Sequence, residues 1–239
     1  MAAASAEDGD RPRLSKSAVV ERALKLADTD GLDALTIRKL AQDLGVTPMA
    51  LYWHFRSKDD LLAALSGQLW SEVDVTIDPG TPWPDQLRAG LWSLLAMLRA
   101  HPSAPQLVLT HEKRNDAALR ATNGALEILR QAGFAKPEAV EVARSSLYLA
   151  IMLVTSEPGH LPGLSAEEAA EYMRRDMITL SLLDPAKYPR VVESAAEMTS
   201  CDDPEFHYEF GVSLFIAGVE AMARRRPQPP PPGTTRPDS

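Results

Sequence analysis

The sequence is poor in cysteine and has no long hydrophobic run. Cys201 is the only cysteine among 239 residues, so the chain cannot form an intrachain disulfide or a thiolate metal cluster. No stretch of about 18 apolar residues occurs, and residues 1–10 are acidic and small instead of basic and then apolar. We therefore expect a soluble, unsecreted, cytoplasmic protein with no membrane partner.

Sequence motifs of common enzymes are also missing. The chain has no phosphate-binding glycine loop, no G-x-S-x-G elbow and no H-E-x-x-H motif. His101, His111, His160 and His207 are scattered, without the i, i+4 spacing or the cysteine partners that metal sites use. The sequence therefore predicts no catalytic residues, no metal site and no cofactor.

Negative charge exceeds positive charge over the whole chain, but not in every part of it. The net charge is −8, yet residues 11–60 carry nine Lys or Arg against seven Asp or Glu. A nucleic-acid surface would be placed in this part, where basic charge is concentrated. Because the local surplus is modest, two copies in a dimer would be needed for strong phosphate neutralisation.

Apolar residues recur at spacings of three and four almost everywhere, whereas alternating strand patterns are absent, so the fold is predicted to be all-α. Three prolines and a glycine in residues 78–84 predict a domain boundary there or just before it. The expected helices cover residues 15–31, 36–44, 47–55, 57–72, 84–100, 104–110, 113–131, 137–156, 166–183 and 204–225, with short helical turns in 185–199.

These elements predict four segments. Residues 1–13 form a disordered arm, and residues 14–62 form a helix-turn-helix domain whose linking helix runs to about residue 74. Residues 75–226 form a larger helical domain, and residues 227–239 form a tail whose proline run cannot be helical. Arg11 and Arg13 in the arm could enter a DNA minor groove or belong to an unstructured tail.

The motif that carries function is LTIRKLAQDLGVTPMALYWHFRSKDDLL, residues 35–62. Two short helices flank a turn at Gly45, and Thr47 followed by Pro48 is a strong helix start. The second helix is therefore the candidate for insertion into the major groove. A small apolar core is expected from Ile37, Leu40, Ala41, Val46 and Leu51.

This segment resembles the DNA-binding domain of the tetracycline-repressor family. The resemblance is carried by LTIRKLAQDLGV, by ALYWHF and by Lys58 and Leu61, and it covers about residues 15–65; QAGF at 131–134 is a weaker echo. It implies a homodimer that binds a double-stranded DNA operator through an N-terminal three-helix domain. It also implies a helical second domain that dimerises and binds a small-molecule effector.

Carried over residue by residue, the resemblance implies phosphate contacts by Thr47, Tyr52, His54 and Lys58, and by Arg38 or its neighbour Thr36. Arg38 could also reach a guanine edge. Pro48, Met49 and Ala50 occupy base-facing positions; because they are apolar, thymine methyl groups are their expected contacts.

Each assignment has an ordinary structural alternative. Trp53 and Phe55 point away from the expected groove face, so we interpret both as core aromatics. Tyr52 could also be a core residue, and Lys58 could be an ordinary solvated lysine.

In the second domain, the resemblance implies that helices 137–156 and 204–225 form a four-helix dimer bundle with a second copy. Their apolar faces fit this role, with Val140, Leu147, Ile151 and Val154 on one helix and Phe210, Leu214, Ala217 and Ala221 on the other. The expected ligand-binding residues are Trp70, Trp92, Asn123, Leu126, Arg144, Leu147 and Tyr148.

The family's founder uses a histidine to bind magnesium-chelated tetracycline, and Leu107 lies at about that position here. Metal-bound tetracycline is therefore not the expected ligand. The predicted function is repression relieved by a small hydrophobic or aromatic effector, with an efflux pump gene as the target that the resemblance favours. The alternative is a DNA-binding regulator that is controlled by a protein partner or has no effector.

Overall fold

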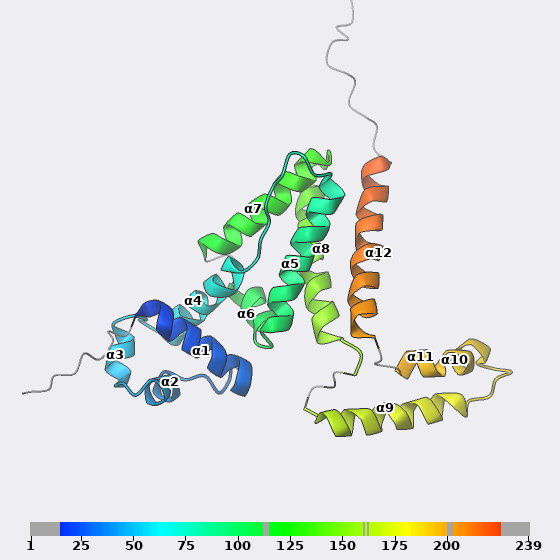
Figure 1. Cartoon of the computed structure of the whole chain (residues 1–239), viewed down its shortest axis with the longest axis horizontal. Helices are drawn as coiled ribbons and strands as arrows, with labels where there is room; N and C mark the ends of the chain where they lie inside the picture. The colour runs from blue at the N-terminus through cyan, green and yellow to red at the C-terminus, as the bar shows by residue number, and fades with distance from the viewer. Residues whose placement is uncertain (1–14, 112–114, 160, 162, 200–202, 226–239) are drawn as a thin grey trace, which may run out of the picture. The chain divides into compact units, whose positions relative to one another are not determined.

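The computed structural model describes residues 15–111, 115–159, 161, 163–199 and 203–225, which form helices joined by loops, with no strand among them (Figure 1). The all-α prediction is confirmed. None of these helices is long and apolar enough to cross a membrane. The chain divides into two compact units: residues up to Glu72 with His101–Leu119, and Val73–Ala100 with the residues from Arg120 onward.

The first unit begins with four helices, each started by a side-chain cap. Ser15, Thr36, Thr47 and Ser57 each accept a hydrogen bond from the backbone N–H three residues later, which satisfies a donor that the helix itself leaves free. The helices are α1 (Lys16–Asp30), α2 (Ile37–Asp43), α3 (Pro48–Tyr52) and α4 (Lys58–Ser71), and α6 (Ala104–His111) joins them.

One core lies beneath these helices. Helix α1 packs against α2 and α4, α2 packs against α3, and α4 packs against α6. Of the expected core residues, Leu40, Ala41 and Leu51 are buried, whereas Ile37 and Val46 are half-buried. Each fully buried leucine contributes about 1.5–3 kcal/mol to stability. The other large buried side chains include Leu35, Phe55, Leu61, Leu65 and Leu69.

The second unit is built on three long helices, α5 (Trp83–Ala100), α8 (Lys136–Thr155) and α12 (Pro204–Arg224), which pack against one another. Helix α7 (Asp116–Gln131) begins in the first unit and continues in the second. A separate layer consists of α9 (Ala166–Ser181), which runs alongside the short helices α10 (Pro189–Glu193) and α11 (Ala195–Thr199) (Figure 1).

The segment that follows α4 is fixed to the second unit by close backbone contacts. A Cβ on Gly124 of α7 would lie 2.8 Å from Val75 Cγ1 and 3.0 Å from the Val75 carbonyl oxygen, so only glycine allows this approach. Buried Gln86 donates hydrogen bonds to the carbonyl oxygens of Asp78 (3.0 Å) and Thr81 (2.7 Å). Residues 73–81 therefore lie across α5 and α7 without needing a helix or strand of their own.

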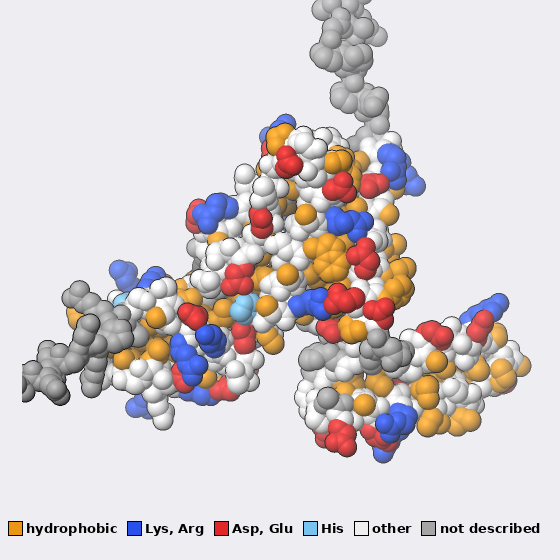
Figure 2. Space-filling view, viewed as in Figure 1, with side chains coloured by type: hydrophobic (Ala, Val, Ile, Leu, Met, Phe, Trp, Pro, Cys, Tyr) orange, Lys and Arg blue, Asp and Glu red, His pale blue; other side chains and the backbone are white. Residues whose placement is uncertain are grey.

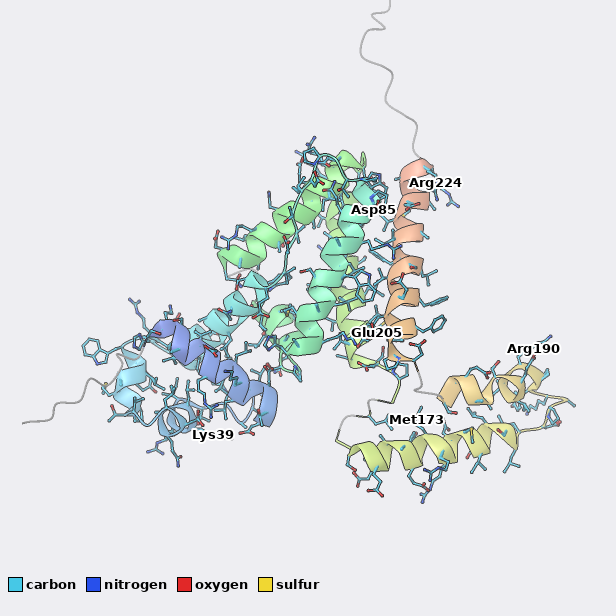
Figure 3. All side chains as sticks on the ribbon, viewed as in Figure 1. Lys39, Asp85, Met173, Arg190, Glu205 and Arg224 are labelled. Carbon is cyan, nitrogen blue, oxygen red and sulfur yellow. The ribbon has the colours of Figure 1, made fainter. Side chains whose placement is uncertain are left out.

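Polar contacts join α5, the end of α8 and the start of α12. The Arg99 guanidinium forms an ion pair with Glu205 (2.5 Å), which is labelled in Figure 3, and lies 4.3 Å from the centroid of the Tyr208 ring. The buried Tyr208 hydroxyl donates a hydrogen bond to Glu157 (2.5 Å). Burial and the Glu157 carboxylate raise the pKa of Tyr208, so its hydroxyl stays protonated at physiological pH.

Candidate nucleic-acid interface and ligand-binding residues

The turn between α2 and α3 depends on Gly45, whose φ of 65° lies in the left-handed region that favours glycine. The Val46 N–H then donates to the Ala41 carbonyl oxygen at 2.9 Å, which folds the chain back toward α2. Leu51 on α3 is consequently buried against that helix. This arrangement is a helix-turn-helix, in which the second helix presents its N-terminus to DNA.

Two threonines stand at the starts of these helices with their side chains exposed. The Thr36 hydroxyl accepts from the Lys39 N–H (3.1 Å), and the Thr47 hydroxyl accepts from the Ala50 N–H (3.4 Å). Each hydroxyl keeps its own proton to donate to a phosphate. The caps therefore fix both groups where the helix dipoles also favour an anion.

The exposed tip of α3 is apolar. Pro48 and Met49 are exposed, Met49 by 67%, and Ala50 is half-buried. Side chains of this kind cannot donate to a base edge, but they can contact a thymine methyl group in the major groove. The positions fit the base-reading role that the resemblance implies for them.

The aromatic residues after the tip separate onto two sides. Phe55 is buried, as expected, whereas Trp53 is 85% exposed, so its interpretation as a core aromatic is wrong. Leu51 and Phe55, four residues apart, occupy the core side, and Trp53 between them is directed outward. This spacing was visible in the sequence. Tyr52 is exposed and His54 is half-buried, which leaves both able to reach a DNA backbone.

Several basic side chains of the first unit are already paired with acids. Arg22 binds Asp43 through two hydrogen bonds, which lowers the pKa of the Asp43 carboxyl. Lys39, labelled in Figure 3, lies 2.6 Å from Asp30. Arg38 is exposed and has no ion pair within the described part of the chain. Arg38 is therefore the side chain of α2 best placed to meet a phosphate or a guanine.

Lys58 is exposed and occupies the first position of α4. Its ammonium group donates to the carbonyl oxygen of Leu32, in the loop between α1 and α2, at 3.3 Å. This bond holds the charge over the loop between α1 and α2. An ammonium group has three donors, so two remain for phosphate oxygens.

The expected ligand-binding residues fall into different environments. Leu147 is buried inside the second unit, whereas Arg144 and Tyr148 on the same helix are exposed. Trp92 and Leu126 are half-buried, and Asn123 is exposed. Trp70, in the first unit, is buried, and its indole N–H has no hydrogen-bond partner among the described residues. No cluster of acidic, histidine or cysteine side chains in the described ranges is arranged to hold a metal.

The outward face of α8 and α12 is strongly apolar, and hydrophobic side chains gather along α12 in Figure 2. Leu214 is 65% exposed, and a groove of about 530 Å³ lies beside it between the two helices. Leu147 was expected on this face, but it is buried within its own chain. The outward positions in this part of α8 are instead those of Tyr148 and Met152. The exposed apolar residues here are Val140, Tyr148, Met152, Phe206, Phe210, Leu214 and Met222.

Comparison with known proteins matches both parts of the chain. Residues 19–65 match the family described as bacterial regulatory proteins, tetR family, and residues 77–223 match the domain described as tetracyclin repressor-like, C-terminal domain. The tetracycline repressor protein class C of Escherichia coli is 30% identical, over 88% of this chain and 92% of that protein.

Two further relatives come from Streptomyces. The HTH-type transcriptional repressor DrrR1 of Streptomyces coeruleorubidus is 29% identical, over 91% of this chain and 82% of that protein. The crystal structure of the Streptomyces coelicolor TetR family protein ActR in complex with actinorhodin is 25% identical, with a TM-score of 0.76, over 88% of this chain and 98% of that chain.

Proposed function

The chain belongs to the tetR family of bacterial regulatory proteins and is a transcriptional repressor, and from this premise we propose that two copies bind a palindromic operator until a small hydrophobic or aromatic effector releases them. The members of this family are DNA-binding regulators and not enzymes, as the sequence led us to expect.

The observation that carries the DNA-binding proposal is the exposed surface of α2 and α3. Threonine hydroxyl donors and the Arg38 guanidinium surround the apolar tip of α3. Phosphate contacts can therefore position the domain on DNA while the tip of α3 contacts the base edges. We assign the phosphate contacts to Thr36, Arg38, Thr47, Tyr52, His54 and Lys58, the base contacts to Pro48, Met49 and Ala50, and an additional contact to the exposed Trp53.

The test is selection of bound sequences from random duplex DNA by the full chain, followed by titration of the selected duplex. We expect an inverted repeat whose half-sites are about one helical turn apart, because each copy places one recognition helix in the major groove. A selected site without two-fold symmetry would contradict the proposal that two copies of the chain bind one operator.

We assign dimerisation to the outward faces of α8 and α12. An apolar surface of this kind is rarely left in contact with water on a stable protein. The faces of two copies are self-complementary when related by a two-fold axis, which is the symmetry of a palindrome. The ring centroids of Phe206 and Phe210 lie 5.6 Å apart on this face, so a pair of aromatic side chains would become buried at the contact.

The effector proposal rests on the second domain and on its relatives. Some relatives are named tetracycline repressors, and ActR was solved with actinorhodin bound. The buried, unpartnered indole N–H of Trp70 would be satisfied by a ligand that accepts a hydrogen bond. Within the second unit, we keep as proposed ligand contacts Trp92, Asn123, Leu126, Arg144, Leu147 and Tyr148, and we keep an efflux pump gene as the target.

Effector binding is tested by adding actinorhodin or tetracycline, without added metal, to the complex of the protein with its selected operator. Loss of the complex at micromolar ligand supports an effector of this chemical class. An operator complex that survives both compounds at saturation would exclude these two as effectors. Loss of response in Trp70→Phe, which keeps the apolar bulk, would assign the indole N–H to the ligand.

A further inference from the structure

His101 lies between two carboxylates in the first unit. It directly follows α5 and precedes α6. Its Nδ1 atom is 2.7 Å from Asp28 Oδ2, in the last turn of α1, and its Nε2 atom is 3.2 Å from Glu72 Oε2, at the end of α4. The side chains of His101 and Asp28 are only 19% and 18% exposed, so water competes weakly for these contacts.

Asp28 also holds the start of α6. Its Oδ1 atom accepts hydrogen bonds from the Ser103 hydroxyl (2.6 Å) and from the Ser103 backbone N–H (3.2 Å). Ser103 is buried immediately before the first residue of α6. The last turn of α1, the start of α6 and the end of α4 therefore meet at one imidazole ring.

The protonation state of His101 decides how many of these contacts can form. Carboxylate oxygens only accept hydrogen bonds, and a neutral imidazole has a single N–H. Neutral His101 can donate to Asp28 or to Glu72, but its other nitrogen then directs a lone pair at the second carboxylate. The imidazolium form donates to both. Asp28 and Glu72 are the charged groups within hydrogen-bonding distance of the ring in the described residues, and Ser103 adds no charge.

The connection matters because α4 is the next helix after α3, the proposed recognition helix, and packs against both α1 and α6. We propose that protonated His101 is a positioning residue that holds the end of α4 against α1 and α6 and thereby keeps α2 and α3 in the orientation that binds the operator. This rests on the proposed operator binding. Asp28 ties α1 to α6 through Ser103 whether or not His101 is protonated, whereas the tie to Glu72 is made only while His101 carries its second proton.

The test measures the affinity of the full chain for its selected operator and for a random duplex of equal length, from pH 5.5 to 8.5 at constant ionic strength. Histidine titrates within this range. We expect operator affinity to fall about threefold between pH 6 and 8, the size of one solvent-exposed ion pair, because the Glu72 side chain is 37% exposed. Affinity for the random duplex reports the phosphate contacts alone, and His54→Gln is the control for the histidine at the proposed DNA surface.

Three variants separate positioning from a merely structural role. His101→Gln should bind the operator weakly at pH 6 and lose the pH dependence. His101→Arg keeps a cation between the carboxylates at every pH, so it should bind tightly at pH 6 and at pH 8. Glu72→Gln removes the carboxylate that faces the lone pair, at an exposed position, and should raise the affinity at pH 8 toward that at pH 6.

The proposal would be overturned if the operator affinity of His101→Gln kept the pH dependence of the wild type. It would also be overturned if His101→Gln and His101→Arg bound the operator equally weakly at pH 8. If both His101 variants melt below the assay temperature, Glu72→Gln decides: an unchanged pH profile in that variant overturns the proposal as well. A wild-type chain that selects no operator at any pH would overturn the proposed function itself.

Discussion

At the scale of single residues, the exposed cations of the first unit differ in what surrounds them. Lys58 lies beside the recognition helix, whereas Lys25 on α1 is paired with Glu21 at 2.7 Å. Each phosphate neutralised by a protein cation releases a counterion from DNA, so its loss is visible in the salt dependence of binding.

We predict that Lys58→Gln weakens binding to operator and random duplex by the same factor and reduces the slope of log affinity against log salt by about 0.9. Lys25→Gln is the matched control and should leave the slope unchanged. An altered base preference with an unchanged slope would remove Lys58 from the phosphate contacts.

Met49 is predicted to read bases through apolar contact. Met49→Gln should change the preferred operator in a selection from random DNA, at a cost of about 1–3 kcal/mol on the original site, because the amide prefers a hydrogen-bonding base edge. Met198→Gln changes another exposed methionine, on α11, and should leave the preference intact. Identical selected sequences for wild type and Met49→Gln would show that this side chain does not read bases.

Two glycines that face the same valine give a matched pair of stability variants. Gly124→Ala places a Cβ 2.8 Å from Val75 Cγ1, so we expect the free energy of unfolding to fall by about 1–3 kcal/mol. Gly90→Ala meets Val75 at an ordinary 3.8 Å and should leave stability unchanged or raise it by about 0.5–1 kcal/mol, since alanine favours the helix. Chemical denaturation measures both, and equal effects would mean that the segment yields to the added methyl group.

At the scale of elements, two leucines on neighbouring helices should respond oppositely to a charge. Leu214→Glu on α12 should give a folded monomer with greatly weakened operator binding, because Leu214 is exposed on the face assigned to the dimer. Leu147→Glu on α8 should unfold the chain, because its carboxylate would be buried without a partner. Sedimentation and thermal melting distinguish the two outcomes; a dimeric Leu214→Glu would move the interface elsewhere.

The helices and their starts could be predicted from the sequence because the signals are local. Ser15, Thr36, Thr47 and Ser57 cap helices as their residue types indicate, and apolar spacing defines each helix. The side of a helix that faces a partner is harder to predict, because the second half of α8, from Leu147 to Val154, carries apolar residues all round. Leu147 and Tyr148 are adjacent in sequence, and only the packing of α5 and α12 decides which of them is buried.

Contacts between distant segments could not be predicted in the same way. Asp28 and His101 are 73 residues apart, and nothing local to either marks the other as its partner. The assignment of DNA contacts rests on the resemblance to a known family and stays a prediction. Trp53 was misplaced because a residue that points away from the groove face is not necessarily buried: Leu51 and Phe55, four residues apart, occupy the core side, and Trp53 between them does not.

At the scale of the whole molecule, the DNA-binding helices do not form a unit by themselves. The first compact unit includes His101–Leu119, and α4 packs against α6 from that segment. A fragment of residues 1–75 would leave Leu65, Leu69 and Trp70 without this cover.

We therefore predict that the fragment 1–75 folds weakly and binds the operator far more poorly than the full chain, since it lacks both α6 and the second half-site contact. Circular dichroism during heating should show no cooperative transition. A sharp transition together with an operator affinity close to that of the full chain would mean that helices α1 to α4 are sufficient for folding and for operator binding.

The α9–α11 layer is thinly packed, since its buried side chains among the described residues are only Ala169, Ala195 and Thr199. Segments with few buried apolar contacts open locally at a small fraction of the free energy of global unfolding. Arg174 and Arg175, whose side chains are 63% and 77% exposed, lie within α9 and are cleavage sites for trypsin. Brief digestion of the folded protein should therefore cut the α9–α11 layer between residues 174 and 176, and the rate of that cut reports the opening of this layer alone.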